Sequence, residues 1–270
     1  MTDDMEPGGS ARGTEHGISI RRDLDDEPEA AIRNAAPDLL TPIDPSSPVS
    51  GHVPLADSGR APASHMPEHD WPAASVVLVP ILRPAGTHGL RIDEIDRATL
   101  VAHANKAHTM PLLGDGPCGL AVVYALPAAG FDVIVNGEHI LSWGVEPEAV
   151  HDAALANLAA WSAGADWSDE SSGGRRLISS DTGAGWDAAR ILLPEVRQFL
   201  EGKLRIEPQA RVLIGLPDRH LLMAGALLPG DAEFAVLFHD YVAEHGDGAD
   251  EPIDRRVFEL VGSELVEFSA

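Results

Sequence analysis

Apolar and β-branched runs occur in pairs along the chain, and the two runs of each pair are separated by a short break that contains Pro or Gly. Such spacing is typical of β-hairpins. Strand pairs with helices between them favour an α+β fold with mostly antiparallel pairing, because a parallel sheet needs strict alternation of strand and helix. The predicted hairpins are 119–126 with 131–135, 211–216 with 221–227, and 256–261 with 265–268, and single strands are predicted at 75–82, 139–143 and 176–179.

Three to four helices are predicted to pack on these strands. Residues 147–164 begin with Pro147, a favoured first helical residue, and carry Val150, Ala154 and Leu158 on one face. The other predicted helices are 185–201, where Pro194 should kink or split the helix, a segment after Asp231, and a thinner pattern over 93–108.

The helix after Asp231 has the clearest start, because an aspartate at the N-cap position accepts hydrogen bonds from the first free amides. Its apolar residues are expected to face inward, and they are Phe234, Leu237, Phe238, Tyr241 and Val242.

The first 72 residues differ in composition from the rest. They hold 10 of the 21 prolines and few large apolar residues, so they are predicted to form a disordered tail. In an alternative interpretation, residues 29–40 form a short helix on a partner. Residues 73–270 are long enough for a single domain with its own core.

Charge narrows the classes of partner. The chain has 19 Lys and Arg against 43 Asp and Glu, a formal net charge of −24. Nucleic acids and anionic membranes both require clustered cations, so both are disfavoured as partners. The apolar runs are about half as long as the roughly 20 residues that span a bilayer.

Cysteine usage and the first residues bear on the compartment. The sequence opens with Met-Thr-Asp-Asp, without the basic and apolar regions of a secretory signal, and Cys118 is its only cysteine. We therefore expect a cytoplasmic protein.

Motifs for cofactors and metals are weak. Residues 114–119 match the spacing of a dinucleotide-binding glycine loop, but a strand follows them where that motif needs a helix. Neither a His-Glu-x-x-His motif nor paired cysteines occur, so no cofactor or metal is predicted. Cys118 is interpreted as a small buried residue, with a reactive thiol as the less favoured alternative.

The strongest candidate for chemistry is the charged break between two apolar strands at residues 217–220. His220 lies beside Asp218 in the sequence and is the candidate general base, and Arg219 is the candidate for orienting an anionic group. In the competing interpretation, Asp218 closes the turn and pairs with Arg219 while His220 begins the next strand. Asp218, Arg219 and His220 are therefore the candidate catalytic residues.

Four segments together, at residues 76–83, 143–158, 187–194 and 215–222, resemble the YtpQ-like bacterial proteins, a family of unknown function. The resemblance covers most of residues 73–270 and implies no activity. The family's turn reads Pro, a small hydroxyl residue, Arg and Asp, whereas this chain has Asp218 and His220 around Arg219. If the family's turn is catalytic through that final acid, the exchange puts activity here in doubt.

The sequence is consistent with two functions. The first is an accessory protein that acts by binding another protein, with the acidic tail as a docking or solubilising segment. The second is a hydrolase-like enzyme or small-molecule binder that uses Asp218, Arg219 and His220. The sequence leaves the oligomeric state open.

Overall fold

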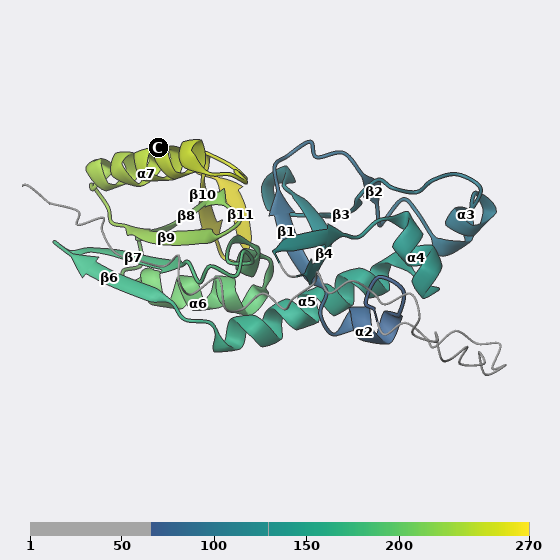
Figure 1. Cartoon of the computed structure of the whole chain (residues 1–270). Helices are drawn as coiled ribbons and strands as arrows, with labels where there is room; N and C mark the ends of the chain where they lie inside the picture. The colour runs from purple at the N-terminus through teal and green to yellow at the C-terminus, as the bar shows by residue number, and fades with distance from the viewer. Residues whose placement is uncertain (1–65, 129, 270) are drawn as a thin grey trace, which may run out of the picture. The chain divides into compact units, whose positions relative to one another are not determined.

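Two β-sheets organise the molecule in the computed structural model, which describes residues 66–128 and 130–269 (Figure 1). All of these residues belong to one unit, residues 58–270. The predicted α+β fold with largely antiparallel pairing is confirmed. The predicted tail and the alternative helix at 29–40 lie outside the described residues, apart from residues 66–72.

The N-terminal sheet has the strand order β1-β4-β3-β2, and β5 also pairs with β4. The β4–β5 hairpin is the one predicted from the sequence. Only β2 and β3 pair in parallel among these strands. The strands are β1 (Val79–Arg83), β2 (Leu90–Arg91), β3 (Leu112–Asp115), β4 (Ala121–Ala128) and β5 (Phe131–Ile134).

The C-terminal sheet is antiparallel throughout, with the order β11-β10-β8-β9-β7-β6. Its two predicted hairpins, β8–β9 and β10–β11, are confirmed. The strands are β6 (Ser168–Ser172), β7 (Arg175–Ser180), β8 (Arg211–Asp218), β9 (Leu221–Leu227), β10 (Val257–Val261) and β11 (Glu264–Glu267).

Six α-helices occur in the described residues, more than the three to four expected, because three of them are short. Pro194 splits the predicted helix at 185–201 into a 3-10 helix and α6, since proline cannot continue the hydrogen-bond pattern of the preceding turn. The helices are α2 (Trp71–Ser75), α3 (Arg97–Ala102), α4 (Gly137–Trp143), α5 (Pro147–Gly164), α6 (Pro194–Leu204) and α7 (Ala232–Gly248), with 3-10 helices η1 (Pro117–Gly119) and η2 (Ala188–Leu192).

The strand predicted at 139–143 is wrong, because this segment is helix α4. Asn136 caps its first amides and forms a capping box with His139, and Gly144 ends it in a left-handed conformation. These end signals outweigh the short apolar run that suggested a strand.

The boundary predicted at residues 72 and 73 falls inside helix α2 (Trp71–Ser75). The Trp71 ring packs 5.6 Å from that of Trp143, whose indole Nε1 donates to the carbonyl of Pro67. Residues 66–72 are therefore packed on the domain rather than part of the tail.

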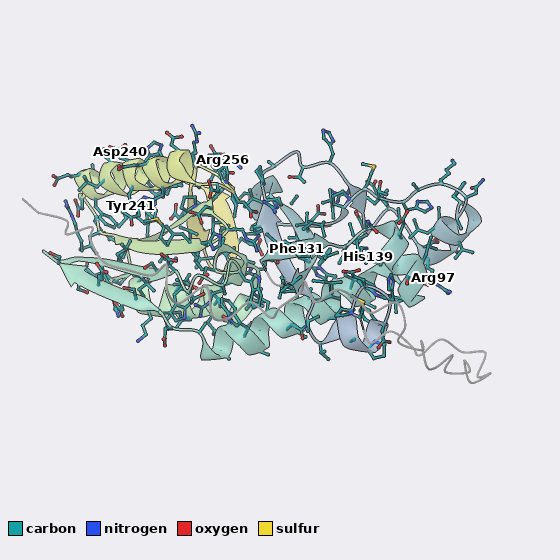
Figure 2. The ribbon with its side chains drawn as sticks, in the orientation of Figure 1. Arg97, Phe131, His139, Asp240, Tyr241 and Arg256 are labelled. Atoms are coloured by element: carbon teal, nitrogen blue, oxygen red, sulfur yellow. The ribbon has the colours of Figure 1, made fainter. Side chains whose placement is uncertain are left out.

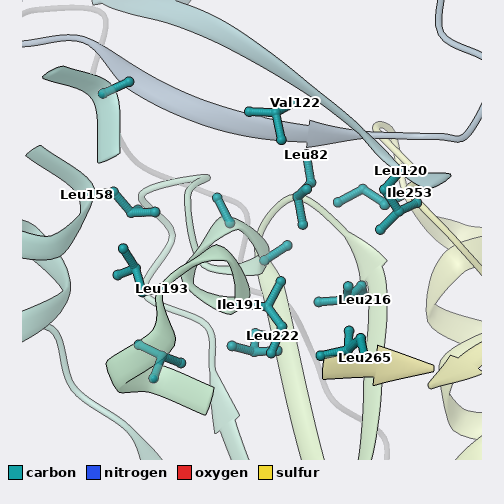
Figure 3. Close-up of a cluster of buried hydrophobic side chains, with 14 of the residues drawn as sticks. Leu82, Leu120, Val122, Leu158, Ile191, Leu193, Leu216, Leu222, Ile253 and Leu265 are labelled. Atoms are coloured by element: carbon teal, nitrogen blue, oxygen red, sulfur yellow. The ribbon is translucent and has the colours of Figure 1, made fainter. Parts of the chain in front are cut away.

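One hydrophobic core joins elements of both sheets (Figure 3). Leu82 and Val122 come from the N-terminal sheet, Leu216 and Leu222 come from the C-terminal sheet, and Ile191 of η2 lies among them. Helix α5 contacts both β1 and η2. The two sheets, η2 and α5 therefore share one hydrophobic core.

Arg190 is the largest fully buried side chain, at 1% exposure. Its guanidinium donates to the Ser162 and Ser180 hydroxyls and to main-chain carbonyls, and it lies 3.7 Å from the Trp167 ring centroid. Burial lowers the pKa of Arg190 to about 10, although Asp187 nearby partly opposes the shift.

Candidate functional site

The predicted catalytic turn joins β8 and β9, and its three polar side chains diverge. The Asp218 carboxylate accepts from the His220 amide at 2.6 Å and closes the turn. Arg219 points inward and is 8% exposed, whereas His220 is exposed. The structure does not bring these side chains together as an acid, a base and an anion-binding group.

Arg219 instead connects three distant segments. Its Nη2 donates to Asp132 Oδ2 at 2.6 Å, its Nη1 to Glu251 Oε1 at 3.1 Å, and its Nε to the Gly185 carbonyl at 3.0 Å. Gly185 has a φ of +79°, and a Cβ there would overlap the guanidinium. Arg219 thus ties β5 of one sheet to the loops that flank the other.

Glu251 also pairs with Arg83 of β1, which completes a group that we call the Arg219 cluster: Arg83, Asp132, Arg219 and Glu251. Partial burial raises the pKa of Glu251, but attraction by Arg219 and Arg83 outweighs that effect and leaves the pKa below its ordinary value. The sequence prediction that Arg219 pairs with Asp218 is wrong. These contacts give Arg219 a structural role, and catalysis at the turn stays a prediction.

Cys118 lies in η1, on the loop that links β3 to β4. Its thiol donates to the Leu265 carbonyl at 3.2 Å, and Arg256 Nη2 donates to the carbonyl of Cys118. Burial raises the pKa of the thiol, which disfavours the reactive thiolate. Cys118 was predicted to be a small buried residue; its side chain is only partly buried, and its hydrogen bond and raised pKa favour a packing role over a nucleophile.

The glycine loop at 114–119 begins in strand β3, contains the short 3-10 helix η1 and leads into strand β4. It therefore lacks the helix N-terminus that holds a pyrophosphate. Over residues 66–128 and 130–269, no three His, Cys, Asp or Glu side chains come together as a metal site.

Helix α7 presents an apolar surface that the sequence analysis did not predict. Leu237 and Tyr241 were expected to be buried, but they are 51% and 43% exposed, and Val236 is 58% exposed. The buried stripe is narrower than predicted, because among the large apolar residues of this helix only Phe234, Phe238 and Val242 are buried, together with the small residues Ala235 and Gly246.

An acidic ridge runs along the same helix. Glu233, Asp240 and Glu244 are all exposed, and their helical spacing places them on the outer face between Val236 on one flank and Leu237 and Tyr241 on the other. Asp240 and Tyr241 are labelled on this helix in Figure 2. We call these six residues the α7 surface.

A groove opens on each flank of α7. The groove beside Val236 has a volume of about 690 Å³ and is lined by Leu227, Ala235 and Phe268, with Arg211 at its edge. The groove beside Leu237 and Tyr241 has a volume of about 530 Å³ and is lined by residues of β7 and β9, which include Leu177 and Met223. Arg175 lines it too, but Asp231 and Glu233 neutralise its charge.

No helix in the described part of the chain is both long enough and apolar enough to cross a membrane.

Comparisons with known proteins give no match for this chain among family models, curated proteins or solved structures.

Proposed function

We propose that this chain acts by binding another protein and that the α7 surface is where the partner docks. The observation that supports this is the exposure of Val236, Leu237 and Tyr241 on one helix, each beside a groove. Exposed apolar side chains that lie beside grooves and are bordered by polar residues are typical of protein interaction sites.

The partner's chemistry follows from the ridge. Glu233, Asp240 and Glu244 separate the two apolar flanks, and the whole chain has a net charge of −24. A segment that presents apolar side chains between Lys or Arg residues would fill the grooves and pair with the ridge. Acidic partners would be repelled.

The test compares three forms of the full chain as bait in cells that express it. These are the unchanged chain, the double variant Leu237→Ser with Tyr241→Ser, and Val101→Ser, which changes a valine that is 52% exposed on another helix. A specific partner is recovered by the first and third forms and lost by the double variant.

The recovered protein is then purified and titrated against each form. We expect the double variant to weaken binding at least about tenfold, a difference of about 1.4 kcal/mol, and binding to fall as salt rises. Equal affinity for the unchanged chain and the double variant would overturn the proposal. Sedimentation in which the unchanged chain forms a dimer and the double variant stays a monomer would also overturn it, because a second copy of the chain would then cover the α7 surface.

A further inference from the structure

The sheet face beneath α7 is wider than one helix can cover. Leu213, Met223 and Val257 point to this face and pack with α7, and of the described helices α7 alone contributes to their cluster. A helix is about 10–12 Å across and neighbouring strands are about 4.8 Å apart, so one helix covers about two to three strands. Helix α7 lies over β8 and its neighbours β9 and β10, and the sheet continues past β9 to β7 and β6.

The groove beside Leu237 and Tyr241, which we call the β7 groove, lies on this uncovered side of α7. Gly225 of β9 faces α7, because a Cβ there would overlap the Phe234 ring. Leu177 of β7 is the cross-strand partner of Gly225, so its side chain points to the same face and packs against the cluster under α7. The groove therefore has an apolar floor and the apolar flank of α7 as one wall.

Negative charge borders this groove on both sides. Glu170 of β6 pairs with Leu177 in the register, and it is exposed and lines the groove. On α7, the exposed Asp240 and Glu244 stand at helical spacing from Leu237. None of these three carboxylates pairs with a Lys or Arg of the described residues. A partner that fits the groove is therefore apolar along its centre and basic along both borders.

A helix suits the β7 groove better than an extended segment. The main-chain groups of β9 and β7 are already paired with neighbouring strands, so the groove offers side chains only. An extended segment on this face would leave its own amides and carbonyls without partners, whereas a helix satisfies them internally. A strand added at the edge of β6 would find no apolar side chain, because that strand reads Ser-Asp-Glu-Ser-Ser.

The sheet also provides the width that a second helix needs. Strands β8 and β6 are three strand spacings apart, about 14 Å, and packed helices lie about 8–10 Å from one another. A helix beside α7 would therefore lie over β9 and β7.

We infer that the partner docks through an amphipathic helix that lies along α7 in the β7 groove. Its apolar row faces Leu177, Leu237 and Tyr241, and Lys or Arg residues border that row on both sides. This inference rests on the proposed function, because it names the element by which the partner binds the α7 surface. It places the groove beside Val236 outside the contact.

The test uses two labelled synthetic peptides of identical Leu, Lys and Ala composition, each 17 residues long like α7. One has Leu at helical spacing with Lys on both sides of the Leu row, and the other alternates Leu and Lys as a strand does. Binding to the full chain is measured by fluorescence anisotropy at an ionic strength of about 0.15 M. We expect the first peptide to bind saturably and to gain helicity by circular dichroism, and the second to bind at least about tenfold more weakly.

Variants of the chain locate the bound helix. Glu170→Lys places a positive charge on the outer wall without altering α7, and it should weaken binding of the helical peptide at least about fivefold. Glu264→Lys makes the same change of charge on β11, at the opposite edge of the sheet, and should change the affinity less than about twofold. Val236→Ser, in the other groove, should also change it less than about twofold.

The outcomes separate this inference from the proposed function. Equal affinity for the two peptides, or equal losses in Glu170→Lys and Glu264→Lys, would overturn the helix in the β7 groove even if Leu237→Ser with Tyr241→Ser still abolishes partner capture. Absence of saturable binding of the helical peptide would overturn it in the same way. Binding and partner capture that are both unaffected by the double variant would overturn the proposed function as well.

Discussion

Two arginines are buried among the residues that the structure describes, Arg190 and Arg219, and their surroundings differ. Arg190 contacts neutral oxygens and the Trp161 and Trp167 rings, and the Ser180 hydroxyl links it to the carboxylate of Asp187. Arg219 pairs directly with the carboxylates of Asp132 and Glu251.

The two arginines differ in how far the carboxylates near them can be hydrated once the arginine charge is removed. Asp187 is 0% exposed and cannot regain water, whereas the side chains of Asp132 and Glu251 keep 19% and 35% of their exposure. The cost of losing a buried charge depends on whether its partners can be solvated again. The Arg190 region should therefore be the more sensitive of the two.

The largest effect is expected from Arg190→Met. It leaves the Ser162, Ala165 and Asp166 carbonyls without this donor and Asp187 without its nearest positive charge. We expect a loss of about 3–5 kcal/mol in the free energy of unfolding, measured by urea denaturation. Arg205→Met, at an exposed pair on α6, should cost less than about 1 kcal/mol.

Arg219→Met should have an intermediate effect. Its carboxylate partners recover part of their hydration, so we expect a loss of about 2–3 kcal/mol in the same assay. His220→Ala, one residue away, should stay within about 0.5 kcal/mol of the unchanged chain. A loss for His220→Ala as large as that for Arg219→Met would show that the turn, not the cluster, carries the stability.

The smallest effect is expected from Glu251 and appears as a pH dependence. Because its pKa is lowered on folding, the carboxylate stabilises the fold above its ordinary pKa, and this contribution is lost as the pH falls through the lowered value. Solvent screening limits it to about 0.5–1 kcal/mol.

Urea denaturation at pH 7 and near pH 4 measures that contribution. The difference in stability between the two conditions should shrink in Glu251→Gln and persist in Glu207→Gln, which changes an exposed carboxylate. An unchanged difference in Glu251→Gln would contradict the assignment of the shift to the Arg219 cluster.

Much of the fold was predictable because its signals are local. Pro194 cannot continue a helix from the preceding turn but is favoured at the first position of a new one, which is its place in α6. Asp231 accepts from the Phe234 amide, as expected of an N-cap residue. Strand β6 was missed because its sequence, Ser-Asp-Glu-Ser-Ser, is polar and entirely exposed, so pairing with β7 alone makes it a strand.

The sites were less predictable because their members are far apart in the chain. Arg219 meets Asp132 across 87 residues and Glu251 across 32, and no spacing rule connects such positions. Similarly, His151 of α5 and Arg197 of α6 are 46 positions apart in the sequence, yet both line one cavity of the folded chain. The exposure of Leu237 and Tyr241 was missed because helical periodicity identifies an apolar stripe but not how much of it the sheet covers.

The contact between the Cys118 thiol and the Leu265 carbonyl makes the reactivity of this thiol sensitive to movement of β11. Because this is the only cysteine in the sequence, an alkylating reagent has a single target, and while β11 stays against η1 the thiol is partly buried and hydrogen-bonded. The alkylation rate of the unmodified protein thus records how often the C-terminal strand separates from the first sheet, a local opening that global unfolding curves average away.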